Sequence, residues 1–336
     1  MEIIINQQKI DYRLQGEKTL GDIINELDRW IKDGDFIIQE VKIDSTSFRL
    51  DGTESEKRLE FLEKSPDDVG SIEIIVKPRF EMAHSTLLSI SEYIKSLLAS
   101  SDRFGNINDY DTLLEGIELI WEGIDRSVNI LGLKPEAIYN SGEKSLKEIM
   151  DSLESLIKSY KRRFFDKEGI LKLKEILESL DDFFSDIIKL AIFENRGMFS
   201  SLDQEVMEDL LKLELRNLII LNNKTINLVE EIVENLQIGN DGAGFNDIST
   251  LMEYISFTIS RMERVLFSFG DTGNEILSEV KKKQREIFKD ITELLKKIES
   301  SFDRMDVIEI TEIIGTELKE SIIELQNLSK TLQKLV

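Results

Sequence analysis

Few residues in this sequence have the type and spacing that chemistry requires. Glu81 and His84 have the Glu-x-x-His spacing with which helical bundles hold two iron ions, because both side chains then lie on one helix face. Such a centre takes this motif from two helices, and His84 is the only histidine of the chain. The same count disfavours a nucleophile–histidine triad. We therefore expect Glu81 and His84 to be ordinary polar residues at the start of a helix.

Adjacent carboxylates, such as Asp67-Asp68, Asp181-Asp182 and Glu230-Glu231, are a second source of chemistry. Acid–base catalysis needs a carboxyl group held in a partly dry pocket, whereas neighbouring acids are common on solvated helix faces when a chain has 66 of them. The chain has no cysteine, which excludes thiolate nucleophiles and thiolate metal ligands. We expect no enzyme activity, no cofactor and no metal. A metal-dependent enzyme that uses only carboxylates is the remaining catalytic alternative.

Glycines are most frequent in residues 239–244. Phosphate-binding loops are rich in glycine too, but they follow a strand, and the P-loop ends in Gly-Lys-Ser or Gly-Lys-Thr. Here a helical pattern ends at Leu236 and another begins near Asn246. The stretch is therefore expected to connect two helices.

One basic cluster includes aromatic residues and is the only candidate interaction patch that the sequence indicates. It could bind anionic lipid, a polyanion or an acidic partner surface, or it could pair with acidic residues of the chain itself. A second cluster, residues 281–285, lacks aromatic residues, and we expect internal pairing there. The candidate patch comprises Lys158, Lys161, Arg162, Arg163, Phe164 and Phe165.

The composition is that of a folded protein of more than one domain. The chain has 336 residues, 41% hydrophobic and 32% charged. Its net charge of −23 disfavours broad nucleic-acid binding, which needs clustered cations. No segment approaches the roughly 18 apolar residues of a membrane span, and the first residues do not resemble a signal peptide. We expect a cytoplasmic protein.

The periodicity of the sequence changes near Pro78. Before it, apolar residues alternate in short runs, which predicts strands. Thr19 is a predicted helix N-cap and Gly34 a predicted stop, and the stripe between them includes Trp30, which we expect in the core. A short helical turn is predicted within residues 54–64. The predicted strands are residues 2–6, 9–15, 36–43, 47–50 and 71–76.

This β-β-α-β-β-β order resembles the ubiquitin-like β-grasp fold, in which a mixed sheet wraps around one helix. The resemblance covers residues 1–78 and rests on the strand–turn–strand start at Met1 and on Thr19-Leu20 before Ile23-Ile24. Conjugated modifiers of that family end in a diglycine tail, whereas here Val76 continues into Lys77-Pro78-Arg79 and a long further segment. The resemblance thus implies a built-in module that serves as a docking surface.

Residues 79–336 are predicted to be helical. Proline occurs in the chain only at positions 66, 78 and 135, so residues 136–336 lack the strongest helix breaker. Short glycine and polar clusters separate long amphipathic stripes, one of which includes Trp121 as an expected core residue. We predict about seven or eight helices in one elongated bundle or two sub-bundles, and an α+β fold class for the whole chain.

This architecture favours a non-enzymatic scaffold or adaptor that mediates protein–protein interactions in a cytoplasmic assembly. The expected partners are proteins, and spare apolar stripes are compatible with a homo-oligomer. An alternative is a peripheral component of a membrane-associated bacterial machine, a secretion or motility apparatus, that touches lipid through the patch between Lys158 and Phe165. For Trp30 and Trp121, both expected in a core, the alternative is a contact between domains or protomers, where tryptophan is over-represented.

Overall fold

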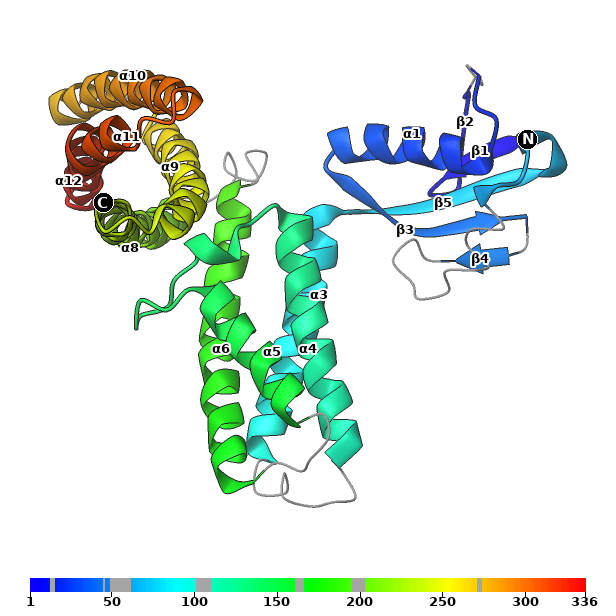
Figure 1. The fold of residues 1–336 in the computed structure, drawn as a ribbon. Coiled ribbons are helices and arrows are strands. Elements are labelled where there is room, and N and C mark those ends of the chain that lie inside the picture. The colour runs from blue at the N-terminus through cyan, green and yellow to red at the C-terminus, as the bar shows by residue number, and fades with distance from the viewer. Residues whose placement is uncertain are drawn as a thin grey trace. The chain divides into compact units, whose positions relative to one another are not determined.

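The computed structural model describes residues 1–12, 16–44, 46–48, 62–100, 110–160, 166–194, 203–270 and 274–336 (Figure 1). The protein is α+β, with an N-terminal mixed sheet followed by a largely helical region. The chain divides into two compact units, Met1–Ile90 with Glu122–Gly132, and Ser91–Trp121 with Leu133–Val336. Within the described ranges, none of the helices combines the length and apolar character that crossing a bilayer requires.

The N-terminal residues 1–78, here called the head, form a five-stranded sheet in the order β2-β1-β5-β3-β4. β1 and β5 pair in parallel, and the other neighbouring strands pair antiparallel. One helix, α1 (Leu20–Asp33), shares a buried core with the sheet that includes Ile3, Val41 and Ile72. The strands are β1 (Glu2–Ile5), β2 (Gln8–Ile10), β3 (Phe36–Ile43), β4 (Thr46–Phe48) and β5 (Ser71–Pro78).

The second strand is shorter than predicted. The alternating pattern continues to residue 15, whereas β2 ends at Ile10. Residues 13–15 lie outside the described part of the chain, as do residues 54–61 of the predicted helical turn. A 3₁₀ turn, Pro66–Asp68, precedes β5, so the Asp67-Asp68 pair lies in a turn.

The start of α1 is a capping box, as Thr19 and Asp22 predict. The Asp22 backbone N–H donates to Thr19 Oγ1 at 3.2 Å, and the Thr19 N–H donates to the Asp22 carboxylate at 3.1 Å. The backbone N–H groups of Lys18 and Thr19 lower the pKa of the Asp22 carboxyl. At the other end, the Gly34 N–H reaches the carbonyls of the last turn and ends the helix.

Changing Thr19 to Ala should destabilise the first turn of α1 by about 1 kcal/mol, because the Asp22 N–H loses its acceptor. Hydrogen exchange of the α1 amides measures this local loss. Lys18→Ala is the matched control, since the Lys18 side chain is exposed and only its backbone takes part in the cap. Equal exchange rates in the two variants would show that the capping box does not hold this end of the helix.

In the described part of residues 79–336, the structure has nine α-helices, against the seven or eight expected. One helix boundary that the sequence does not predict is a π turn, Ile314–Leu318. It lies between α11 and α12, and no loop separates these two helices. The helices are α3 (Arg79–Ala99), α4 (Tyr110–Leu131), α5 (Leu146–Tyr160), α6 (Lys167–Glu194), α8 (Gln204–Gln237), α9 (Asp241–Ser268), α10 (Glu275–Asp303), α11 (Val307–Ile313) and α12 (Lys319–Gln333).

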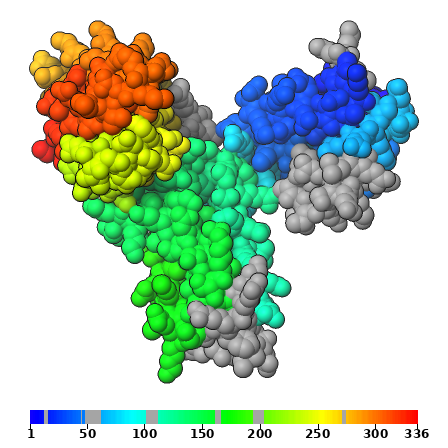
Figure 2. All heavy atoms as spheres, in the orientation of Figure 1, coloured from blue at the N-terminus to red at the C-terminus, as the bar shows by residue number. Residues whose placement is uncertain are grey.

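The C-terminal helices α8 to α12 surround one common core. Each of these helices contributes buried apolar residues to the core. Examples from this part of the chain are Leu218, Leu251, Ile291 and Leu318. Figure 1 shows these helices grouped together, coloured from yellow-green to red, and Figure 2 shows the same part of the chain as a close-packed body. Helices of this length expose a long polar face once their apolar stripe is buried.

The glycine stretch lies between α8 and α9, but α9 begins at Asp241, five residues before the predicted start. Gly239 has a left-handed backbone, with φ of 78°, and ends α8. Gly244 lies within α9, where an added Cβ would come within 2.6 Å of the Leu236 side chain. The glycines therefore serve the close packing of α8 against α9 as well as the turn.

Candidate functional site

The head leaves one end of its inner sheet face uncovered. Successive residues of a strand point to opposite faces, so Ile5 and Val76 share the face of Ile3 and Ile74. Ile3 and Ile74 are buried in the core with α1, whereas Ile5 and Val76 are only partly buried. Ile5 and Val76 lie at the edge of the core, against which both pack only partly.

Two exposed aromatic side chains border this uncovered end. Phe36 begins β3, two residues before the buried Ile38, and is 39% exposed. Trp30, near the end of α1, is 63% exposed. We call the resulting hollow of about 630 Å³ the head groove. It is lined by Ile5, Asn6, Gln8, Ile10, Trp30, Ile31, Asp33, Gly34, Phe36 and Val76.

The exposure of Trp30 corrects the expectation that it packs in the core. The buried residues of α1 end with Ile31, which is one position later. One helical step turns the side chain by about 100°, so Trp30 lies at the edge of the stripe. The sheet covers only the centre of the apolar stripe of α1. Trp30, at the edge of that stripe, remains exposed to water. The width of the apolar stripe was the one signal of this exposure in the sequence.

The β1–β2 turn fixes the floor of the groove. Asn6 and Gln7 both have positive φ, 46° and 67°, as a tight hairpin turn requires. The Asn6 side chain then pairs with the backbone of Val76 in both directions. Its Nδ2 donates to the Val76 carbonyl at 3.1 Å, and its Oδ1 accepts from the Val76 N–H at 2.9 Å. The Asn6 amide thus extends the β1–β5 ladder and holds Val76 in place.

The chemistry of the head groove suits binding. Among the described residues that line it, Asp33 is the one charged side chain, and the others are apolar or amide. Aromatic residues that lose water on contact provide much of the free energy of protein–protein association. The arrangement therefore matches an apolar side chain or short segment of a protein partner.

Residues 1–78 match the family model of the TP0873 N-terminal domain. The matched segment ends at the last residue of β5 and contains every residue that lines the head groove. The match does not extend to α3 or the later helices. Comparison of the chain with curated proteins and with solved structures finds no match.

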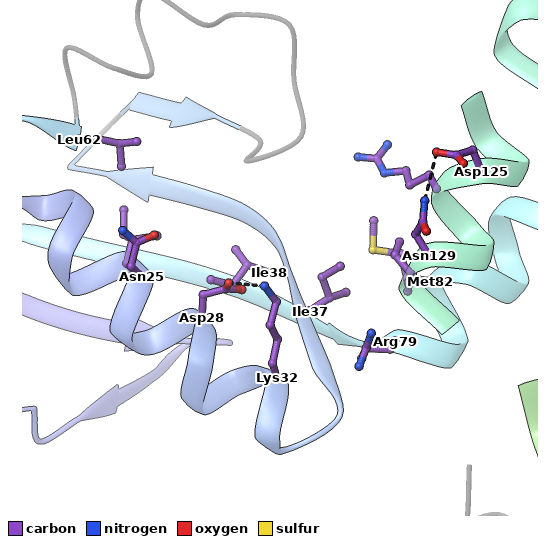
Figure 3. A pocket seen from close by; sticks show the side chains of 13 residues that line it. Asn25, Asp28, Lys32, Ile37, Ile38, Leu62, Arg79, Met82, Asp125 and Asn129 are labelled. Atoms are coloured by element: carbon purple, nitrogen blue, oxygen red, sulfur yellow. Dashed lines mark hydrogen bonds and ion pairs between the residues drawn. The ribbon is translucent and has the colours of Figure 1, made fainter. Parts of the chain in front are cut away.

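A second hollow, of about 650 Å³, lies in the same compact unit as the head (Figure 3). Four of its polar side chains bond to one another. Lys32 pairs with Asp28 at 2.6 Å, and the Asn129 amide donates to the Asp125 carboxylate at 3.1 Å (Figure 3). Because these groups satisfy each other, this hollow presents fewer groups to a ligand than its lining suggests.

The predicted basic–aromatic patch falls mostly on residues 161–165, which lie outside the described part of the chain. This segment contains Lys161, Arg162, Arg163, Phe164 and Phe165. Lys158, the remaining member, is exposed on α5 and pairs with Glu154 at 2.7 Å. In the second cluster, Lys282 and Lys283 pair with Glu286 and Glu324.

Glu81 and His84 lie near the start of α3, where the His84 ring stacks on Phe80 with 5.5 Å between centroids. In the residues that the structure describes, no group of three His, Asp or Glu side chains is arranged as metal ligands. Members of the other two carboxylate pairs join helices. Asp181 accepts from Ser91 Oγ at 2.9 Å, and Glu230 pairs with Lys319 at 2.7 Å.

The helical region contains a buried ion pair that the sequence does not predict. Glu214 of α8 and Arg261 of α9 are almost fully buried, with 3.4 Å between Oε1 and Nε. Arg261 Nη1 also donates to the Ala137 carbonyl at 2.7 Å, and Asn217 Oδ1 accepts from the Tyr139 N–H at 2.9 Å. These bonds fasten the segment before α5 to α8 and α9.

Tyr139 lies inside this polar cluster and is fully buried. Burial raises the pKa of its hydroxyl, which therefore stays protonated. Lys224 Nζ lies 5.3 Å from the centre of the Tyr139 ring and bonds to Glu148 at 3.0 Å. The cluster is a structural element, because Glu214 pairs with Arg261 and Lys224 with Glu148, although the Tyr139 hydroxyl and Glu214 Oε1 are buried without a hydrogen-bond partner among the described residues. Trp121, also expected in the core, is partly buried on α4.

Proposed function

We propose that this protein is a non-enzymatic scaffold or adaptor in a cytoplasmic assembly, and that the head docks a protein partner through the head groove. The observation that carries the proposal is the uncovered end of the sheet, where Trp30 and Phe36 stand exposed beside apolar strand residues. A folded domain keeps such a surface in water at a cost, and contact with a partner removes that cost.

We further propose that the head is a ubiquitin-like β-grasp module. The mixed sheet, with α1 packed on one face and its parallel pairing of β1 with β5, supports this fold. After β5 the chain passes directly into α3 at Arg79. Such a head continues along the chain into the helical region, and it acts through its surface and not through a conjugated tail.

The helical region then has the role of presenting the head and holding further partners. Its helices α8, α9 and α10 each run for 28 residues or more and offer extended polar faces. The alternative role at a membrane-associated machine depends on residues 161–165, which the structure does not describe, and Lys158 alone does not favour it.

Capture of the full-length tagged protein from its native cells tests the proposal. The decisive variant is Trp30→Asp, which introduces a charge into the groove at an already exposed position and should leave the fold intact. We expect the main partner to be lost from this variant and retained by Leu171→Asp, which alters a comparably exposed leucine on α6. Equal recovery of the partner by both variants would contradict docking through the head groove.

A further inference from the structure

Another hollow, different from the head groove and from the one in Figure 3, lies in the helical region at the π turn. It measures about 520 Å³ and is enclosed by the last turns of α8, the first turns of α11 and the π turn itself. We call it the π-turn groove. It is lined chiefly by Val233, Leu236, Val307, Ile308, Thr311 and Gly315.

The π turn packs closely against α8 at this groove. Gly315, its second residue, faces Val233, and an added Cβ would lie 3.0 Å from Val233 Cγ2. A side chain at position 315 would thus crowd Val233 and push the turn away from α8. π turns are rare and frequently occur at functional sites, because the widened turn displaces side chains from the regular helical positions.

Apolar side chains stand in water at and next to the groove. Ile308 lines the groove and is 81% exposed, although the neighbouring Ile310 is fully buried in the bundle core. Ile238 directly follows the groove residue Gln237 and is exposed as well. The apolar surface therefore extends from the floor of the groove to its rim.

The charge around the groove is negative. Glu312 lines it, and Glu234 lies in the last turn of α8, which contains no basic residue. The carboxyl end of a helix carries a partial negative charge, so a carboxylate there is unfavourable and a cation is favourable. The nearby Lys319 pairs with Glu230, whereas in the described part of the chain Glu234 and Glu312 take part in no ion pair.

We propose that the π-turn groove docks a basic amphipathic helix of a partner protein. The apolar face of that helix covers Ile308 and Val233, and its lysines or arginines meet Glu234 and Glu312. Helix-in-groove recognition places apolar anchors three and four residues apart, which suits a groove between two helices. A second copy of this chain is disfavoured as the occupant, because its net charge is −23. This site is separate from the head groove.

The test uses the full-length protein and a fluorescent synthetic helix of leucines and lysines, about 18 residues long, which is sufficient for a stable helix. Fluorescence anisotropy at about 0.15 M salt measures its affinity. We expect Ile308→Gln to weaken binding about tenfold or more. The double variant Glu234→Gln/Glu312→Gln should weaken binding and also reduce its salt dependence.

Matched controls keep this test specific. Ile323→Gln/Glu299→Gln alters an exposed isoleucine on α12 and an exposed glutamate on α10, and it should leave the affinity within about twofold, as for surface residues outside a contact. The Trp30→Asp variant should bind the peptide normally, so failure here is distinguishable from failure of the head groove. A lack of peptide binding, equal binding of a leucine–glutamate helix, or equal loss in the control double variant would overturn the proposal.

Discussion

Replacing Arg261 by Met should lower the free energy of unfolding of the helical region by about 3–5 kcal/mol, because it leaves a buried carboxylate without its partner. Glu214 is 1% exposed, and its Oε1 lies 3.4 Å from Arg261 Nε. The substitution also removes the donor that Arg261 gives to the Ala137 carbonyl. Both losses act in the same direction, since a buried group that loses its bond keeps its full desolvation cost.

Urea unfolding followed by circular dichroism measures this effect. Arg285→Met is the control, because Arg285 is exposed on α10, and its change should stay within about 0.5 kcal/mol. The double variant Arg261→Met/Glu214→Leu should recover part of the lost stability, since no unpaired charge then remains. A loss below about 1 kcal/mol for Arg261→Met would mean that the ion pair is not buried as described.

Replacing Trp30 by Ala should weaken binding of the captured partner by about 2 kcal/mol or more, which corresponds to roughly 30-fold in Kd. Phe36→Ala should have an effect of the same sign. Both rings border one hollow, and the floor beneath them is Val76. Because one partner segment would contact both rings, the double variant should lose less than the sum of the single losses.

Calorimetric titration of purified partner into each variant gives these affinities. Leu119→Ala is a matched control, since Leu119 is 64% exposed, nearly the same as Trp30, but lies on α4 outside the groove. Circular dichroism should show unchanged folds, because both groove residues are exposed. Additive and small losses, equal to that of Leu119→Ala, would place the partner elsewhere on the protein.

Much of the head could be predicted from the sequence because local signals there agree with one another. The short β-rich runs at β1, β3 and β5 and the Thr19–Asp22 cap are properties of neighbouring residues, and the structure has strands and a capping box at those places. The exposure of Trp30 could not be predicted in this way. It depends on how far the sheet extends under α1, and that is set by the pairing of strands distant in sequence.

The helical region was predictable in kind but not in arrangement. Amphipathic stripes predict helices, yet many stripes of leucine and isoleucine are interchangeable as packing partners. Nothing local pairs Glu214 with Arg261, whose helices α8 and α9 come together only in the folded core. The π turn was also missed, because it changes the hydrogen-bond pattern by one residue without proline or a glycine cluster to mark it.

The most direct test of the central claim is the fluorescence of Trp30 in the full-length Trp121→Phe protein, where it is the only tryptophan. Free Trp30 is 63% exposed, so its emission should lie at long wavelength and acrylamide should quench it readily. Saturation with a captured partner that lacks tryptophan, or whose tryptophans are replaced by phenylalanine, should shift the emission to shorter wavelength and protect it from quenching. An unchanged spectrum and unchanged quenching at saturation would contradict docking in the head groove.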